Sequence, residues 1–369
     1  MQLTNLEIVN FKNIPEAQME FCDGVNCLIG LNGMGKSNLL EAIHLLSMAR
    51  PMTSMPESAL ITHGGDMLMV KGHYRMDAGQ EESVSCGIVK GKGKTLRRNG
   101  KEYNRISEHI GRFPIVSVTP ADSEIVTGAG EVRRRLMDMV ISQADPTYLP
   151  RLIRYNKALE SRNKMLRAGI GDRLLYEAVE ATMAEAAAGV FAARKKWTEQ
   201  LAPGFAAYYS RISGDAETAS LEYRSVLSDA TLAEVFDAQR ARDLALGFTS
   251  AGPHRDDLVT HLGQYSMRRL GSQGQVKSFT IALRLAIHDY LRESSGLTPI
   301  LLLDDIFDKL DSERVGRIME IVSGRDTFGQ IFITDTNRQH LDETLARVKG
   351  PSKLFHVDSG KFSIINHQS

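Results

Sequence analysis

The sequence predicts an α/β protein whose strand-rich head is built from both ends of the chain and carries a mainly helical insertion. Three observations support this fold class. Short apolar or alternating runs, typical of strands, gather before residue 118 and after residue 251. A glycine-rich loop joins one of these runs to an apolar helical segment. The region between the two ends is rich in Ala, Leu, Glu and Arg with helical spacing.

The composition is that of a globular protein and excludes several classes. The 369 residues are 42% hydrophobic and 24% charged, and 45 basic residues balance 45 acidic ones. Neutrality excludes a uniformly basic nucleic-acid-binding surface but leaves room for a local basic patch. The three cysteines are too few for a disulfide framework. No apolar run reaches the roughly 18 residues that cross a bilayer, and the N-terminal segment alternates like a strand rather than a signal peptide, so we expect a cytoplasmic protein.

Periodicity places the first elements in chain order. Residues 2–9 and 17–23 are expected to form a strand pair, and residues 25–29 a short buried strand that enters the glycine-rich loop. Residues 67–118 return to short alternating strands, in which Asn99-Gly100 predicts a two-residue hairpin turn.

The middle of the chain reads as several helices. Apolar residues recur with helical spacing between Leu175 and Trp197. Gly169–Gly171 and Pro203-Gly204 are expected to separate one helix from the next, and strands resume near Asp257. We therefore expect three segments: the N-terminal part of the head over residues 1–118, a mainly helical lobe over 119–250, and the C-terminal part of the head over 251–369.

The strongest chemical signal is GLNGMGKS at residues 30–37, which fits the pattern G-x-x-x-x-G-K-[ST] between a buried strand and a helix. Backbone N–H groups of such a loop bind phosphate oxygens at the helix N-terminus. Lys36 is expected to contact the β- and γ-phosphates of ATP, and Ser37 to bind Mg²⁺. The expected nucleotide-binding residues are Gly30, Leu31, Asn32, Gly33, Met34, Gly35, Lys36 and Ser37.

A second motif, PILLLDD at residues 299–305, is an apolar strand that ends in two acids. Such a strand delivers a carboxylate to the magnesium ion of a bound nucleotide, which is the role expected of Asp304. Asp305 then lies where a carboxylate can orient or deprotonate the attacking water. Asp305 and Lys36 are therefore the predicted catalytic residues.

A third motif, GSQGQ at residues 271–275, precedes an apolar helix over 276–291. Serine, glycines and amides at a helix start suit a terminus that faces phosphate. Taken alone, the segment fits an ordinary capped turn equally well, and it gains weight only from its order with the other two motifs.

This order of motifs resembles the ABC-type ATPases of DNA repair and chromosome maintenance and, within them, the RecF family. The resemblance covers the whole chain and includes NGMGKSNLLEAIHLLS, SQGQ and LLLDDIFDKLD. Its most discriminating parts are TPADSEIVTGAGEVRRRLMD at 119–138 and GPHRDDL at 252–258, since generic ABC proteins lack both.

The resemblance implies an ABC-type P-loop ATPase head without a long coiled coil. In this family the SQGQ segment is the signature, which contacts the nucleotide held by the other subunit of an ATP-bound homodimer. Ser272 and Gly274 are therefore expected to act in trans, and Asp311 matches the D-loop at the same interface. The resemblance further implies DNA binding at gaps and single/double-strand junctions, action with RecO and RecR in loading RecA, and roles in recombinational repair, replication restart and the SOS response.

The chain departs from the ABC pattern at several positions. The signature reads SQGQ in place of LSGGQ, the acid after the second motif is Asp305 in place of Glu, and Thr334, Asp335 and Thr336 stand where a switch histidine is expected. No convincing Q-loop glutamine is present. These departures predict weak ATP hydrolysis, used as a timed switch and stimulated by DNA.

A basic segment stands out in the neutral chain. Between residues 90 and 105, seven basic residues face one acid, Glu102. On a hairpin, such a segment can bind DNA phosphates without sequence preference; the alternative is a solvated edge strand whose lysines prevent aggregation. The candidate DNA-binding residues are Lys90, Lys92, Lys94, Arg97, Arg98 and Lys101.

Three smaller features leave alternatives open. The run Arg133–Arg135 could contact DNA or pack within the helical lobe. In GPHRDD, His254, Asp256 and Asp257 could form a metal site. A turn whose Arg255 and aspartates form ion pairs within the lobe interface is favoured, because no further histidine or cysteine lies near in sequence. Lys12 takes a place often held by Arg in the family, where it could reach the nucleotide.

Other functional classes fit less well. A transport subunit would show LSGGQ, a Q-loop and a switch histidine. A chromosome-structuring protein with long arms needs several hundred residues of heptads, and only 266 residues separate Ser37 from Asp304. An ABC-linked nuclease would need a further acidic metal-binding domain after Asp311, and a small-molecule kinase would leave SQGQ unexplained.

Overall fold

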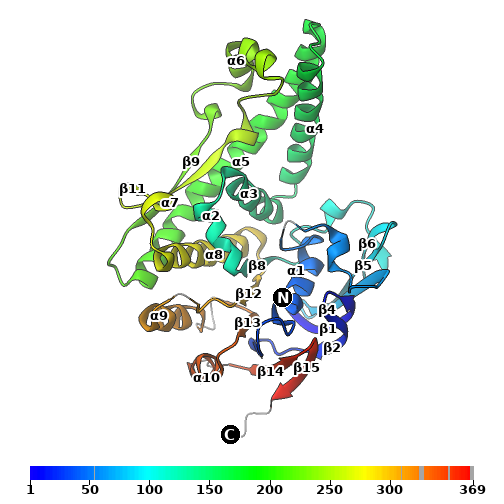
Figure 1. Cartoon of the computed structure of the whole chain (residues 1–369), viewed down its shortest axis with the longest axis vertical. Helices are drawn as coiled ribbons and strands as arrows, with labels where there is room; N and C mark the ends of the chain where they lie inside the picture. The colour runs from blue at the N-terminus through cyan, green and yellow to red at the C-terminus, as the bar shows by residue number, and fades with distance from the viewer. Residues whose placement is uncertain (54, 309, 324–327, 348–349, 366–369) are drawn as a thin grey trace. The chain divides into compact units, whose positions relative to one another are not determined.

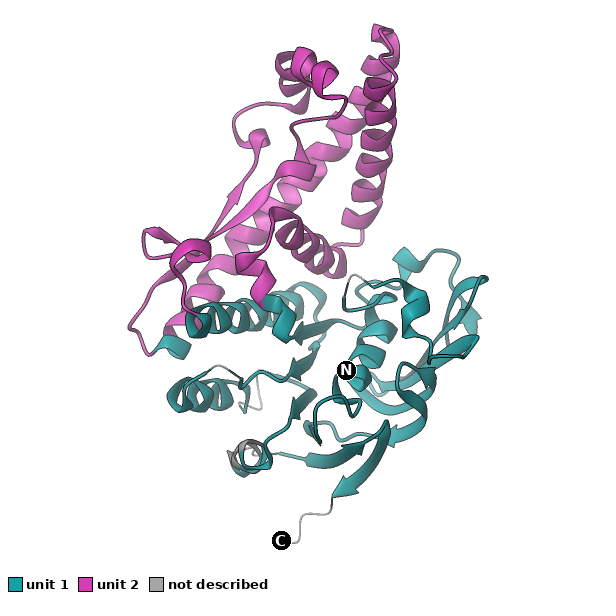
Figure 2. Ribbon diagram, in the orientation of Figure 1, with its two compact units in different colours: residues 1–122, 211–213, 273–369 teal, residues 123–210, 214–272 magenta. Residues whose placement is uncertain are grey.

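A computed structural model of the chain describes residues 1–53, 55–308, 310–323, 328–347 and 350–365. It divides into two compact units, shown in Figure 2. Unit 1 contains residues 1–122, 211–213 and 273–369, and unit 2 contains residues 123–210 and 214–272. This division differs from the expected boundary at 250/251: residues 251–272 belong to unit 2, because the strand over Asp257–Leu262 pairs there with the strand over Ala219–Arg224.

Unit 1 is built on a six-stranded, mostly parallel sheet. Its order is β15 (Lys361–Ile365), β14 (Ser352–Asp358), β3 (Val25–Ile29), β13 (Ile331–Asp335), β12 (Ile300–Asp304), β8 (Ile115–Val118). Only β15 runs antiparallel, to β14. Every residue of β3, β12, β13 and β8 is buried, as expected of parallel strands covered on both faces.

A second sheet of unit 1 is antiparallel. Its order is β2 (Ile14–Glu20), β1 (Gln2–Phe11), β4 (Met67–Arg75), β5 (Glu81–Val89), β6 (Gly93–Arg98), β7 (Lys101–Glu102). Burial alternates along β4 and β5, which indicates one covered face. The predicted hairpin turn is confirmed: Asn99 and Gly100 both have positive φ, and Arg98 pairs with Lys101.

Helix α1 (Lys36–Met48) packs against both sheets of unit 1, contacting β1 and β4 on one side and β12 and β13 on the other. This position explains why every residue from Leu39 to Met48 is buried, where an ordinary surface helix would keep one polar face. On the other side of the parallel sheet in Figure 1 lie α8 (Gln273–Ser295), α9 (Ser312–Val322) and α10 (Arg338–Arg347).

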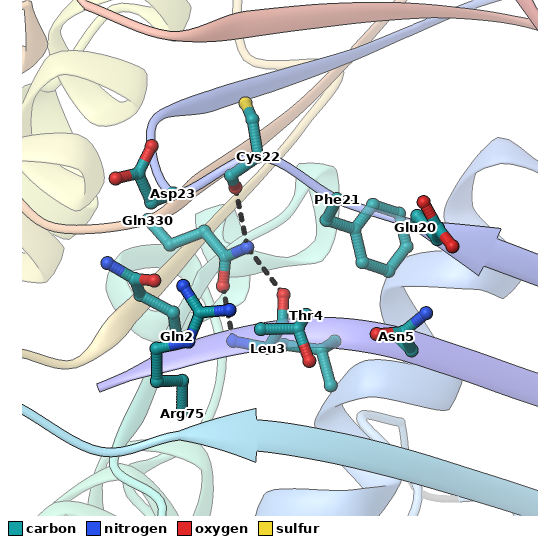
Figure 3. Close-up of a pocket in the computed structure, with 10 residues that line it drawn as sticks. All are labelled: Gln2, Leu3, Thr4, Asn5, Glu20, Phe21, Cys22, Asp23, Arg75 and Gln330. Carbon is teal, nitrogen blue, oxygen red and sulfur yellow. Dashed lines mark hydrogen bonds between the residues drawn. The ribbon is translucent and has the colours of Figure 1, made fainter. Parts of the chain in front are cut away.

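The side chain of Gln330 joins the two sheets at the amino-terminal end of β13. Its Oε1 accepts from the Leu3 N–H at 2.7 Å, and its Nε2 donates to the carbonyls of Leu3 and Cys22, both at 2.8 Å (Figure 3). The pocket around it, of about 460 Å³, is lined by these residues together with Gln2, Thr4, Asn5, Glu20, Phe21, Asp23 and Arg75.

Unit 2 is mainly helical. Its helices are α2 (Ser123–Thr127), α3 (Gly130–Ala144), α4 (Tyr148–Arg167), most of α5 (Arg173–Ser213), α6 (Leu232–Leu246) and α7 (Met267–Leu270). A small antiparallel sheet has the order β11 (Tyr265–Ser266), β10 (Asp257–Leu262), β9 (Ala219–Arg224). Short 3₁₀ turns across the chain cover Glu57–Leu60, Ile106–Glu108, Pro120–Asp122, Val226–Ser228 and Pro253–Arg255.

Helix α5 contradicts one sequence prediction. Gly169–Gly171 do lie between α4 and α5, but α5 continues through Pro203 instead of ending there. A proline inside a helix removes one hydrogen bond and costs about 3 kcal/mol. Four large apolar side chains at i, i+4 spacing, Trp197, Leu201, Phe205 and Tyr209, are all buried along this stretch. Their burial outweighs the loss, since each stabilises by roughly 2 kcal/mol.

Two buried arginines organise unit 2. Arg162 donates to Glu180 at 2.9 Å and to Asp243 at 2.7 Å. Arg194 donates to Asp138 at 2.8 Å and to Asp256 at 3.1 Å. Each cation is thus enclosed with two carboxylates.

Arg133 and the GPHRDD segment both form contacts within unit 2. Arg133 forms a bidentate ion pair with Asp257, at 2.7 and 2.9 Å, so this arginine packs within the lobe. His254 shares a hydrogen bond of 2.7 Å with Tyr155. In the described part of the chain, no three His, Cys, Asp or Glu side chains are grouped to hold a metal.

Among the residues that the structure describes, no helix is both long and apolar enough to span a membrane.

Candidate nucleotide-binding site

Three neighbouring strands of unit 1 deliver the site to one edge of the sheet. The strands β3, β13 and β12 are parallel, with β13 between the other two. Their carboxyl ends therefore meet at one edge, where open α/β sheets bind ligands. The register pairs Asp304 with Thr334, and Gly30 follows directly after the end of β3. The sheet thus brings together the glycine-rich loop and the two acids that the sequence predicted to act together.

The loop between β3 and α1 needs its glycines. Gly33 has φ +81° and Gly35 has φ +115°, values that favour glycine. A Cβ at Gly30 would lie 2.3 Å from the carbonyl oxygen of Val357 in β14. The side chains of Leu31 and Asn32 are exposed, Met34 is half-buried, and α1 begins at Lys36. The segment therefore forms an exposed loop that ends at a helix N-terminus, the arrangement that binds phosphate.

Lys36 folds back into this loop. Its Nζ donates to the carbonyl oxygens of Gly30 at 2.7 Å and of Leu31 at 2.9 Å. Burial lowers the pKa of the Lys36 ammonium, and the neighbouring carboxylates of Asp305, Asp304 and Asp335 oppose that shift. An ammonium held among carbonyl oxygens beside a helix N-terminus is placed to contact phosphate oxygens.

Ser37 and Asp304 touch directly. Ser37 Oγ donates to Asp304 Oδ1 at 2.8 Å, and the same oxygen accepts from Thr334 Oγ1 at 2.7 Å. A hydroxyl and a carboxylate are oxygen ligands of the kind that Mg²⁺ prefers, and magnesium on a nucleotide needs only one or two from the protein. The donor set at this point therefore fits Mg²⁺ bound to a nucleotide phosphate.

Asp305 has an unusual backbone. Its φ is +48°, in the left-handed region that few non-glycine residues adopt. Burial raises the pKa of its carboxyl, and the nearby carboxylates of Asp335, Asp304 and Asp308 raise it further. Negative charge is thus concentrated at this edge, which favours the binding of a cation.

Sequence reasoning assigned no role to Asn13, which the structure places against the loop. Its Nδ2 donates to the Gly33 carbonyl at 3.0 Å, and its Oδ1 accepts from Asn38 Nδ2 at 2.7 Å. An asparagine after a strand is an ordinary turn residue, so the sequence carries no signal for this contact. The neighbouring Lys12 forms an ion pair with the buried Glu41, so its contact with nucleotide stays a prediction.

In the sequence, Thr334 stands out only because it lies where ABC proteins have a switch histidine. The structure gives it two hydrogen bonds: the one to Asp304 described above, and one accepted from the Asp305 N–H at 3.0 Å. Its hydroxyl therefore connects both acids of the second motif.

The signature segment lies at the start of α8. Gly274 is in the first turn of this helix, and Ser272 is the last residue of unit 2. Asp311 is the N-cap of α9, where its side chain accepts from the Arg314 N–H at 2.8 Å. Lys309, two residues earlier, lies outside the described residues. The roles of Ser272 and Gly274 in trans stay a prediction.

The basic segment covers β6, β7 and the turns beside them. Lys90, Lys92, Arg97 and Lys101 are exposed. Arg97 lies 3.7 Å from Glu102, in a pair of which both members are exposed. Two other candidates are held in less exposed ion pairs: Lys94 pairs with Glu57, and Arg98 pairs with Glu82. These ion pairs favour the four exposed residues as phosphate contacts and give Lys94 and Arg98 a structural role.

Comparisons with known proteins agree with this geometry. Residues 2–360 match the RecF/RecN/SMC N terminal domain family. The DNA replication and repair protein RecF of Phocaeicola vulgatus is 46% identical over 363 residues, which are 98% of this chain and 98% of the relative. Among solved structures, the recombination mediator protein RecF-ATP in the RecFOR pathway aligns with a TM-score of 0.88 and 30% identity, covering 99% of this chain and 97% of the other.

A more distant similarity concerns the fold alone. An SMC head bound to the C-winged helix domain of ScpA aligns with a TM-score of 0.58 and 16% identity, over 99% of this chain and 97% of the other. The predicted fold class, an α/β head of the ABC type with an inserted helical lobe, is confirmed.

Proposed function

Because the chain belongs to the RecF family of DNA replication and repair proteins, we propose that it binds ATP and acts on DNA in recombinational repair and replication restart. The observation that carries this proposal is the meeting of Gly30–Ser37, Asp304 and Asp305 at one edge of the parallel sheet. The solved RecF-ATP structure aligns with 99% of this chain, which supports ATP as the ligand of this edge.

The residues present fit ATP with Mg²⁺. The loop N–H groups, the α1 N-terminus and Lys36 would hold the phosphates, while Ser37 and Asp304 would hold the metal. When bound, the metal supplies positive charge to the phosphate oxygens. Asp305 is placed at the same edge, where its carboxylate can orient or deprotonate a water molecule.

The site is completed by a second copy of the chain in this proposal. One subunit supplies the loop and the acids, and Ser272 and Gly274 of the other subunit contact the γ-phosphate across a dimer interface. Affinity between the two copies then depends on that phosphate, so ATP favours the dimer and hydrolysis releases it. The departures from the ABC pattern at Asp305 and Thr334 support slow hydrolysis, well below the roughly 10 per second of a typical enzyme.

The DNA and protein partners follow from the family. We propose that the ATP-bound form binds gapped DNA and single/double-strand junctions and works with RecO and RecR to load RecA. The exposed residues Lys90, Lys92, Arg97 and Lys101 support a contact with the DNA backbone. Such a contact reads charge and spacing, not base sequence.

Binding to fluorescent gapped duplex tests this function directly. We expect high affinity with ATP and weaker affinity with ADP or without nucleotide. Equal affinity under all three conditions would contradict an ATP-controlled DNA-binding protein. A matched single strand and a nick-free duplex of the same length serve as the comparison substrates.

The basic segment can be tested in the same assay. Replacing Lys90, Lys92 and Lys101 together by Gln should weaken binding to all sequences. It should also make the negative slope of log affinity against log salt shallower by about 2 to 3, since each phosphate contact contributes close to −1 to that slope. Replacing Lys157, Lys164 and Lys195 of unit 2 by Gln is a charge-matched control. An unchanged slope in the first variant would place the DNA contact elsewhere.

A further inference from the structure

The peptide of Asp305 is held on both sides by side chains from other elements of unit 1. Its N–H donates to Thr334 Oγ1 at 3.0 Å, and its carbonyl accepts from Lys277 Nζ at 3.3 Å. Both contacts meet a residue whose φ of +48° costs energy for any side chain larger than glycine. A backbone in this region persists where the surroundings over-determine it, and these two contacts hold the Asp305 backbone from which the carboxylate projects.

The two contacts come from different sources. Thr334 is fully buried at the end of β13, next to β12 in the sheet. Lys277 lies on α8, in the turn after Gly274 of the signature. The catalytic acid is thus attached to the rigid sheet through Thr334 and to the signature helix through Lys277.

Charge keeps Lys277 at this place. Four carboxylates, those of Asp305, Asp122, Asp308 and Asp304, act on its ammonium, and Asp122 in turn forms a bidentate ion pair with Arg284 of α8 at 2.7 and 3.0 Å. A half-buried ammonium among carboxylates loses much when it leaves them, because few other positions offer the same compensation.

A second connection runs from the signature to the D-loop segment. Ser278 Oγ donates to the Gly274 carbonyl at 2.8 Å and accepts from Arg314 Nη1 at 2.8 Å. Arg314 also lies 3.3 Å from Asp311. Adjacent side chains of α8 therefore reach both ends of the segment from Asp305 to Asp311.

We propose that Lys277 and Ser278 are positioning residues that transmit docking of the signature to the catalytic segment of the same subunit. When the signature of one copy contacts the nucleotide of the other, the first two turns of α8 become fixed. Through Lys277 the peptide of Asp305 becomes fixed as well, and through Ser278 the D-loop segment follows. Each subunit thereby senses that its own signature is engaged before its own acid is in place.

This inference rests on the proposed function, since it needs an ATP-bound dimer. It goes beyond that function by naming residues that contact the Asp305 backbone and the D-loop segment, and by giving the direction in which the signal travels. It also gives a role to the half-buried lysine that follows the signature.

Lys277→Met is the main test, with Lys277→Arg as the conservative variant and Arg292→Met, on the same helix, as the control. Four quantities are measured: ATP affinity, sedimentation with ATP, kcat and KM of hydrolysis, and deuterium uptake of residues 304–308. For Lys277→Met we expect unchanged ATP affinity and an intact ATP-dependent dimer. We expect kcat to fall about tenfold to a hundredfold with KM unchanged, and deuterium uptake to rise in the dimer.

The controls separate positioning from general stability. Lys277→Arg should restore most of kcat and the protected exchange, and Arg292→Met should behave as wild type. Should Lys277→Met fold poorly, Ser278→Ala tests the second connection by the same measurements, with the D-loop segment 310–315 as the exchange readout. Wild-type kcat and exchange in the folded variants would overturn the inference, and so would a loss of ATP affinity equal to the loss of kcat. A wild-type chain that stays monomeric with ATP would instead refute the proposed function.

Discussion

The two units differ in how their buried charges are arranged: unit 2 pairs opposite charges, and the sheet edge of unit 1 gathers like charges. In unit 2, Arg162 and Arg194 each lie between two carboxylates, so positive and negative groups compensate one another. At the sheet edge of unit 1, burial raises the pKa of the Asp305 carboxyl, and the nearby carboxylates of Asp335 and Asp304 raise it further.

The difference separates a structural network from a binding site. Compensated buried pairs hold elements together, and breaking one is costly. At the sheet edge, the ammonium groups of Lys36 and Lys277 offset the carboxylates only in part, since the pKa of Asp305 stays raised, and the remaining negative charge favours the binding of a cation. Stability should therefore depend on the arginines of unit 2, and ligand binding on the charges of unit 1.

The largest expected effect tests the first half of this comparison. Arg162→Met leaves Asp243 buried without its cation and takes from Glu180 one of its two arginine partners, Arg240 being the other. We therefore expect a loss of about 3–5 kcal/mol in the free energy of unfolding. Chemical denaturation measures it. The exposed pair Arg154–Glu185 gives the control, since Arg154→Met should cost under about 1 kcal/mol. Equal losses in the two variants would remove the distinction between compensated and exposed charge.

The second prediction tests the other half. Lys36→Met removes the ammonium that lies within the glycine-rich loop, so ATP affinity should fall about a hundredfold, the scale of hydrogen bonds to a charged group. The free energy of unfolding should change far less than in Arg162→Met. Calorimetric titration with ATP gives the affinity and denaturation gives the stability. A variant that loses as much unfolding free energy as Arg162→Met but still binds ATP with wild-type affinity would reverse the roles assigned to the two units.

A smaller effect concerns pH and sharpens the view of unit 1. Burial lowers the pKa of His44 to about 3 and that of His109 to about 4, from an ordinary 6.5. Well above pH 6.5 both rings are neutral in the folded and in the unfolded chain, so they do not change the free energy of unfolding with pH. Below pH 6.5 the unfolded chain binds protons that the folded chain does not. Each histidine should then cost about 2 kcal/mol between pH 6.5 and 5.

Denaturation across that pH range measures the loss. His109→Gln should flatten the decline, whatever its effect on absolute stability. His73 on β4, which is half-buried with a side-chain accessibility of 42% and lies 3.5 Å from Glu7, supplies the control position. A slope that His109→Gln leaves unchanged would show that this ring is not the source of the acid sensitivity.

The sequence predicted the parts of the site that depend on local pattern. A loop with three glycines and a Lys-Ser pair after a buried strand has few other uses, and an apolar strand that ends in two acids identifies its partner. The interruption between α4 and α5 also followed from Gly169–Gly171.

The remaining features depend on tertiary contacts. The sequence predicts a helix end at Pro203, because it does not show that the apolar side chains at i, i+4 spacing around the proline are all buried in a core. The contacts of Asn13, Thr334 and Lys277 join residues far apart in the chain, and each residue type is ordinary at its position. The extent of unit 2 depended on the pairing of β9 with β10, which short strands with little periodicity do not specify.

Sedimentation velocity of Asp305→Asn with ATP, with ADP and without nucleotide tests the central claim, that a second copy completes the nucleotide site. The substitution removes the carboxylate that we propose acts on water in hydrolysis, so ATP should persist and the chain should sediment as a dimer only with ATP. Ser272→Arg added to this variant should leave ATP binding intact and keep the chain monomeric. A monomer that binds ATP tightly in the single variant, or a dimer that Ser272→Arg does not disturb, would contradict the account.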